Sequence, residues 1–102
     1  MTYGEVWWVD FPTVGRRPGL IITRTVAVPV LDNLVLATVS TSIRGVPTEV
    51  LLDRHDGMPR PSAVSLDNLH TVPKRLLGRR IATLSDKRMD QVCDALRYAT
   101  SC

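Results

Sequence analysis

Two adjacent arginines, Arg16 and Arg17, stand directly before Pro18 in the segment GRRPGLIITR, residues 15–24. A residue before proline is biased toward an extended backbone, and the fixed φ of proline stiffens the position from which the Arg17 guanidinium projects. A rigidly held guanidinium can stabilise negative charge that develops on a phosphate during a reaction. Solvated arginines of a loop have the same sequence, so the spacing alone leaves both interpretations open.

Three hydroxyl side chains follow one another at the end of an apolar segment, in VSTS at residues 39–42. If this segment is a strand, alternation puts Ser40 and Ser42 on one face and Thr41 on the other. Hydroxyls at a strand end can hold a phosphate oxygen, or they can satisfy the backbone of a turn. The motif therefore supplies candidate phosphate ligands without specifying that use.

Other chemistry-bearing residues form weaker patterns. His55 and His70 are the only histidines, and nothing in their spacing brings them together as the base and acid of a two-histidine ribonuclease. No His, Asp and Glu cluster has the spacing of metal ligands, so we expect no metal and no cofactor. Cys93 and Cys102 lack CxxC spacing, and we expect neither a zinc site nor a structural disulfide from them.

Two neighbouring tryptophans, Trp7 and Trp8, must point to opposite faces if EVWWVDF at residues 5–11 is a strand. One ring then belongs to the core. The other is exposed unless it contacts a base, a partner subunit or a C-terminal helix. Packing of both rings inside the protein is the alternative.

The composition is that of one globular domain of 102 residues, with 44% apolar and 23% charged residues. The net charge of +3 and the pI of about 9.3 favour polyanionic partners modestly. Eleven of the 13 cations are arginine, which binds phosphate bidentately and stacks on bases, although a GC-rich genome gives the same bias. No apolar run reaches the ~20 residues of a membrane helix, and MTYGEVWW lacks the features of an export signal. We therefore expect a cytoplasmic protein.

Proline and glycine divide the first three-quarters of the chain into short apolar segments, which is typical of strands. The tail has helical spacing, with Met89, Val92, Cys93 and Leu96 on one stripe and Ser85 as N-cap. Residues 74–80 are ambiguous, and we expect a short helical turn before Gly78 and then a brief strand through Ile81. The pattern predicts a mostly β, α+β domain over residues 1–102, a small five-stranded barrel followed by one helix. The expected strands are 5–11, 19–25, 34–41, 46–53 and 63–72, the last with a break at Asp67-Asn68.

Four segments resemble, in order and spacing, the MazF/PemK endoribonuclease toxins of type II toxin–antitoxin systems. These segments are YGEVWWVDFP, GRRPGLIITR, TVSTSIRGVPTEVLL and PSAVSLDNLHTVPKRLLGRRIATLSDKRMDQVCDAL. The most specific pieces are the Arg-Pro pair, the P-x-E-V motif and the D-N-L-x-T-V motif. The resemblance implies a five-stranded SH3-like barrel with a C-terminal helix that acts as a homodimer.

The resemblance also implies an activity, the cutting of single-stranded RNA at short motifs without a metal. In that reaction the 2′-hydroxyl attacks the adjacent phosphorus and leaves a 2′,3′-cyclic phosphate and a 5′-hydroxyl. The family arginine corresponds to Arg17, and the family hydroxyl residue to Ser40, with Thr41 beside it. An aspartate of the plasmid-encoded branch corresponds to Asp67, followed by Asn68. We assign charge stabilisation to Arg17, phosphate positioning to Ser40, and orientation or deprotonation of the 2′-hydroxyl to Asp67.

This chain departs from the family in two places. The segment PTVGRRP is shorter than the family loop that helps cover the RNA site, so the cleavage motif does not follow from the sequence. Where the plasmid-encoded branch has a second arginine, this chain has Ser65. Arg16, Arg24 and Arg44 are the candidates for that RNA-binding role.

Two other functions remain open. Gyrase-poisoning toxins share the small barrel but act on a protein through their C-terminal residues, and they need no arginine at the second strand. A plain nucleic-acid-binding barrel would stack bases on Trp7 or Trp8 without cutting. The family resemblance further implies an antitoxin with an acidic C-terminal segment that folds onto the basic surface.

Overall fold

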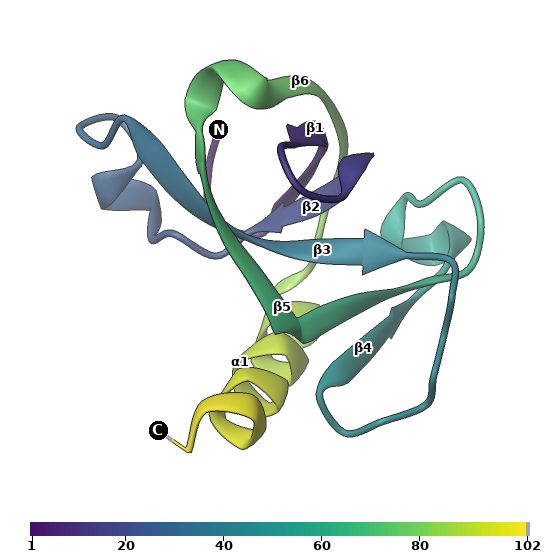
Figure 1. Ribbon diagram of the computed structural model, residues 1–102. Coiled ribbons are helices and arrows are strands. Elements are labelled where there is room, and N and C mark those ends of the chain that lie inside the picture. Colours follow the sequence, from purple (N-terminus) through teal and green to yellow (C-terminus); the bar gives the residue numbers. More distant parts are fainter. Residues whose placement is uncertain (102) are drawn as a thin grey trace.

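The computed structural model describes residues 1–101 as one curled antiparallel sheet of six strands with a single α-helix packed against it (Figure 1). The order of strands across the sheet is β4-β5-β3-β2-β1-β6. Short 3-10 helices cover residues 25–27, 54–56 and 74–76. The elements are β1 (Glu5–Phe11), β2 (Gly15–Ile21), β3 (Asn33–Ser40), β4 (Glu49–Leu52), β5 (Ser62–Pro73), β6 (Leu77–Thr83) and α1 (Asp86–Thr100).

The prediction of five strands was wrong by one. Part of the ambiguous segment 74–80 is a 3-10 turn, and the rest begins β6, which pairs with β1 along its whole length. Leu77 and Ala82 of β6 are buried, but three exposed residues follow Leu77 where the register shifts. These bulges interrupt the alternation by which a strand is recognised in a sequence.

Strand β2 begins four residues earlier than expected, at Gly15, and ends at Ile21 rather than at residue 25. Gly15 has a φ of +81°, which glycine adopts without strain, and the hairpin turn is completed before the two arginines. Arg16 and Arg17 therefore lie in the strand, paired with Asp10 and Val9 of β1. Their backbone is held by the sheet as well as by the following proline, so the interpretation as loop arginines is wrong.

The connection between β3 and β4 is longer than expected, since β4 starts at Glu49 instead of residue 46. The Glu49 carboxylate accepts hydrogen bonds from the backbone amides of Arg44 and Gly45, at 3.0 and 2.8 Å from Oε1, and so closes a loop over residues 41–48. These two bonds replace the strand pairing that the sequence suggests for residues 46–48.

The expected break at Asp67-Asn68 is a bend within a continuous β5, visible as the sharp turn of that strand beside α1 (Figure 1). The partner of Ala37 on β3 is Leu69, whereas the partner of Thr38 is Ser65, so three residues of β5 bulge out of the ladder. The bulge turns the first half of β5 toward β4.

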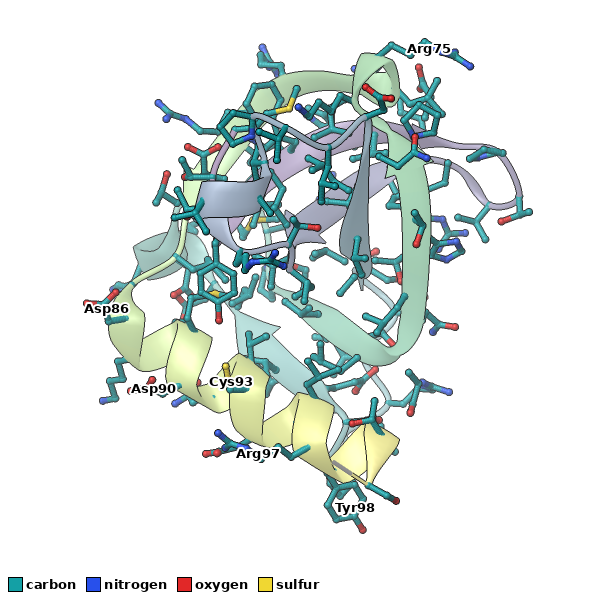
Figure 2. The ribbon with its side chains drawn as sticks, turned by 90° about the vertical axis from the view of Figure 1, so that its left-hand side faces the viewer. Arg75, Asp86, Asp90, Cys93, Arg97 and Tyr98 are labelled. Atoms are coloured by element: carbon teal, nitrogen blue, oxygen red, sulfur yellow. The ribbon has the colours of Figure 1, made fainter. Side chains whose placement is uncertain are left out.

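The predicted helix is confirmed, with Ser85 as N-cap accepting a hydrogen bond from the Arg88 amide. Its buried residues are Met89, Val92 and Ala95, which pack against the sheet in one of two core clusters. Figure 2 shows Asp86, Asp90, Arg97 and Tyr98 projecting from the helix into solvent. Within residues 1–101, no helix is long and apolar enough to span a bilayer.

Candidate active site

An open hollow of about 600 Å³ lies where the β1–β2 hairpin, the end of β3 and the loop before β5 meet. It brings together cationic and hydroxyl side chains from three segments that are distant in the sequence. Its lining residues are Trp8, Arg16, Arg17, Pro18, Val39, Ser40, Thr41, Ser42, Pro59, Arg60 and Ser62. Four of the eight predicted site residues are therefore in one place.

The pairing of β2 with β3 brings Arg17 toward Ser40. The last pair of this ladder is Gly19 with Thr38, and Arg17 and Ser40 each lie two residues beyond it, where both line the hollow. The Nε atom of Arg17 donates to the Val14 carbonyl oxygen at 3.2 Å, within the hairpin turn. This bond fixes the direction of the guanidinium, and within residues 1–101 its terminal nitrogens form no hydrogen bond or ion pair.

The hydroxyl of Ser40 accepts a hydrogen bond from the Ser42 amide at 3.0 Å, so it terminates the strand and shapes the turn that follows. A hydroxyl that accepts one bond still has its own proton to donate. The expected alternation does not reach Thr41 and Ser42, because β3 ends at Ser40. All three side chains line the hollow instead of dividing between two faces.

The two tryptophans divide as a strand requires. Trp7 packs beside a buried cluster and donates from Nε1 to the Glu5 carboxylate at 2.9 Å. Trp8 lines the hollow, with the guanidinium carbon of Arg16 at 5.4 Å from its ring centroid, a cation–π contact. Arg16 also lies 3.9 Å from the exposed carboxylate of Asp10. One indole therefore belongs to the core and the other to the site.

Sequence reasoning missed two residues of the hollow, Arg60 and Ser62. Arg60 is exposed and adds a third guanidinium, from the loop before β5. Ser62 is only 3% exposed, and its Oγ has no hydrogen-bond partner among the described residues. A buried hydroxyl without a partner normally carries a desolvation cost, so it is a ready ligand for an incoming oxygen. The available signal was proline on both sides of Arg60, which stiffens that loop as Pro18 stiffens the start of β2.

The loop that carries Arg60 is tied to the helix. Asp56 Oδ1 accepts from Arg88 Nε at 2.9 Å, and both side chains are largely buried. Burial raises the pKa of Asp56, but the hydrogen bonds from Arg88 and from the Asp53 amide outweigh this effect and lower it overall. The same carboxylate forms a capping box with Asp53 around residues 54–56. One ion pair thus joins the segment that precedes Arg60 to the helix.

Four of the predicted site residues lie outside the hollow. Asp67 accepts a hydrogen bond from the Thr48 hydroxyl at the bend of β5, and Asn68 donates to Ser65 Oγ at 2.9 Å. Arg44 is 3.6 Å from Glu49 in the loop between β3 and β4. Arg24 precedes the 3-10 helix at residues 25–27, which follows the other end of β2. One copy of the chain therefore brings together Arg16, Arg17, Ser40 and Thr41 only.

Neither histidine lines the hollow. His55 is exposed in the 3-10 helix at residues 54–56, and the His70 ring packs 5.0 Å from that of Phe11. In the part of the chain that the structure describes, no three His, Cys, Asp or Glu side chains gather as metal ligands would. Cys93 is a free thiol 3.3 Å from the Tyr3 hydroxyl, and burial together with this contact raises the pKa of Tyr3 to about 12. Cys102 lies outside the described residues.

Comparisons with known proteins point to one family. The family described as PemK-like, MazF-like toxin of type II toxin-antitoxin system matches residues 2–100. Probable endoribonuclease MazF5 of Mycobacterium tuberculosis is 41% identical over 97% of this chain and 92% of its own length. Endoribonuclease EndoA of Bacillus subtilis is 30% identical over 94% of this chain and 90% of its own.

Solved structures agree with the sequence relatives. Mycobacterium tuberculosis toxin MazF-mt6 superimposes with a TM-score of 0.89 at 35% identity, covering 95% of this chain and 96% of that one. An endoribonuclease in complex with its cognate antitoxin, from a mycobacterial species, gives a TM-score of 0.89 at 25% identity, covering 99% and 95%. The curled sheet with its terminal helix is thus the fold of these proteins.

Proposed function

Because this chain belongs to the PemK-like, MazF-like family of toxins and is an endoribonuclease of that family, we propose that the hollow cleaves single-stranded RNA without a metal ion. The observation that carries the proposal is that Arg17, Ser40 and Arg60 line the same hollow. Arginine supplies permanent charge and several donors, which suits a reaction that concentrates negative charge on phosphate oxygens.

The proposed reaction is an internal displacement on the RNA. The 2′-oxygen loses its proton and bonds to the adjacent phosphorus, and the bond from phosphorus to the 5′-oxygen breaks. The departing 5′-oxygen gains a proton, so the products are a 2′,3′-cyclic phosphate and a 5′-hydroxyl. Arg17 stabilises the phosphorane through its free terminal nitrogens, and Ser40 donates its hydroxyl proton to a phosphate oxygen.

The reaction also needs a group that accepts the proton of the 2′-hydroxyl. Arginine is a poor base because its pKa is too high, so Arg17 does not fill this role. Asp67 stays a prediction from the family resemblance, since its carboxylate is bonded to Thr48 outside the hollow. If Asp67 acts as the base, Asp67→Asn lowers the cleavage rate at saturating RNA; if it only contacts RNA, the same variant raises KM alone.

The partners follow from the same family. We propose that the chain acts in the cytoplasm as a homodimer and is inhibited by an antitoxin, as the mycobacterial relative is bound by its cognate antitoxin. An acidic segment of the antitoxin would cover the hollow, where Arg16, Arg17 and Arg60 are exposed. The same cations then serve both the RNA and its competitor.

The test is incubation of mixed single-stranded RNA with the protein in EDTA, with an Arg17→Ala variant as the control, followed by mapping of the new 5′ ends. The proposal expects discrete cuts with 5′-hydroxyl ends that the variant does not make. Intact RNA in a folded, dimeric preparation would contradict it. If such a preparation still binds RNA, the chain is a binding barrel that stacks bases on Trp8.

A further inference from the structure

The hollow does not end at Trp8. A second hollow of about 530 Å³ adjoins it, lined by Trp8, Gly57, Pro59, Arg79, Arg80 and Ile81. Trp8 and Pro59 line both hollows, so they form the boundary between the two. A chain lying along this surface would pass the arginines of β2, then an indole ring, then the arginines of β6.

The arginines of β6 reach this surface because the strand bulges. From Trp7 to Val9 strand β1 advances two residues, whereas their partners on β6, Arg80 and Leu77, are three residues apart. A regular strand would put Arg79 and Arg80 on opposite faces, but here both are exposed and line the same hollow. The bulge therefore gathers two neighbouring charges on one side of the sheet.

The two arginines differ in how free they are. Arg80 Nη1 lies 3.3 Å from Glu5, whose carboxylate is mostly buried. Arg79 forms no ion pair or side-chain hydrogen bond with any described residue. Arg79 is thus the residue of the second hollow whose charge is available to a ligand.

Trp8 is half-buried and carries Arg16 at 5.4 Å from its ring centroid. An aromatic ring with cations on both sides is the arrangement by which single-stranded nucleic acids are bound, since bases stack on the ring and phosphates meet the cations. An RNA chain offers a base to the ring and a phosphate to the arginines at every nucleotide, whereas an acidic protein segment is bound mainly through its carboxylates and so by the arginines. The ring between the two hollows therefore favours RNA as the ligand.

We propose that RNA extends from the catalytic hollow across Trp8 into the second hollow, where a base stacks on Trp8 and Arg79 binds a flanking phosphate. The inference rests on the proposed function, because it assigns the path of the substrate on either side of the reacting phosphate. It adds Trp8 and Arg79 as binding residues outside the reacting atoms. Both residues contribute to the affinity for longer RNA.

The test measures binding separately from cleavage. Fluorescence anisotropy with a labelled 2′-O-methyl RNA, which has no free 2′-hydroxyl, gives the Kd of native protein, Arg79→Ala and a control variant, Arg97→Ala. Arg97 is an exposed arginine on α1 (Figure 2), and it lines neither hollow. We expect Arg79→Ala to weaken binding several-fold and to reduce the slope of log K against log salt by about 0.7, while Arg97→Ala matches native protein.

Trp8 is tested with the same probe. Trp8→Ala is expected to weaken binding by about 5- to 150-fold, the effect of losing one stacked base. Trp8→Phe keeps a ring and retains most of the affinity, which also controls for folding. An abasic sugar-phosphate oligomer of equal length should bind native protein and Trp8→Ala equally.

Three results would overturn the inference. One is an Arg79→Ala variant with the native Kd and salt slope, and another is an equal loss in Arg97→Ala. The last is an abasic oligomer or polyglutamate that native protein binds as tightly as RNA, with a Kd that Arg79→Ala raises by the same factor. That result would assign the second hollow to an acidic protein segment. Since the probe cannot be cleaved, a failure of the proposed catalysis leaves these measurements intact and is recognised separately, by intact RNA in EDTA.

Discussion

Arg17 and Arg60 at the hollow and Arg88 at the helix are in opposite situations. Arg17 and Arg60 are exposed at the hollow and have no carboxylate partner within residues 1–101. Arg88 is three-tenths exposed and donates to Asp56 at 2.9 Å and to Gln91 at 3.0 Å. The same residue type is exposed without a carboxylate partner in one region and is hydrogen-bonded to neighbouring side chains in the other.

This difference separates charges used by the fold from charges available to a ligand. A guanidinium already paired with a buried carboxylate loses that pair when a phosphate competes for it, which costs free energy. An exposed guanidinium with fixed direction and no partner meets a phosphate without such a loss. Loss of an arginine at the hollow should therefore affect activity, and loss of the pair at the helix should affect stability.

The largest expected effect is that of Arg17→Ala on the cleavage rate. Removal of one preorganised donor to a developing oxyanion typically lowers the rate by about 10²–10³. Stability should change by less than about 0.5 kcal/mol, because the side chain is exposed and makes only one hydrogen bond, to Val14. Single-turnover cleavage at saturating RNA and urea denaturation measure the two quantities. A large loss of stability together with the loss of cleavage rate would contradict the distinction between arginines that serve activity and arginines that serve the fold.

Asp56→Asn should show the opposite behaviour. A hydrogen bond to a charged group contributes about 1.5–3 kcal/mol, so the variant should lose that much stability while the folded fraction keeps the native cleavage rate. Because the pKa of Asp56 is lowered in the folded state, its contribution is present above the unfolded value near 3.8 and is lost as the pH falls through the folded value. Urea denaturation between pH 7 and pH 3 should show native protein converging on the variant.

Asp94→Asn is the matched control for this pH dependence, since the Asp94–Arg97 pair is exposed at both ends. Its stability curve should follow that of native protein at every pH. An equal loss of unfolding free energy in the two aspartate variants would show that burial is not the reason why the Asp56 pair stabilises the fold.

Ser62→Ala is expected to have a smaller effect, and it tests whether a buried hydroxyl at the hollow serves RNA binding or the fold. The Ser62 hydroxyl is buried without a partner, so its removal should leave stability unchanged or raise it by up to about 1 kcal/mol. If the hydroxyl binds RNA, the Kd should rise by about 2- to 12-fold, the value of one hydrogen bond. A variant that is less stable, with native affinity, would mean that Ser62 serves the fold alone.

The smallest expected effect is that of Arg97→Ala on stability. Its partner Asp94 is one turn away on the exposed side of α1, and such surface pairs contribute less than about 0.5 kcal/mol. Thermal unfolding and cleavage should both match native protein. A clear loss of activity would show that arginine far from the hollow also contributes to RNA binding.

Much of the fold follows from local patterns. Strand β1 and the helix were predicted with bounds close to those observed, because alternation and helical spacing are local signals. Strand β6 was expected only as a brief strand through Ile81 and was not counted among the five, since its bulges interrupt the alternation of buried and exposed residues. The early start of β2 depends on its pairing with β1, which the sequence does not display.

The site was predicted in part for the same reason. Arg17 and Ser40 come from neighbouring antiparallel strands, and a family motif identifies both. Arg60 and Ser62 were missed because they lie about 20 residues further along, in the loop before β5 and at the first residue of β5, and they reach the hollow only in the folded chain. Such long-range approach leaves no mark on a single sequence.

The most direct test of the proposed reaction uses a short RNA that the protein cuts once, compared with the same RNA carrying a single 2′-deoxynucleotide before the cut. We predict that the modified RNA binds with the same Kd as the unmodified RNA and remains uncut in EDTA. Cleavage of the modified RNA at the unmodified rate would contradict the account, because the attacking oxygen would then be that of water instead of the 2′-hydroxyl.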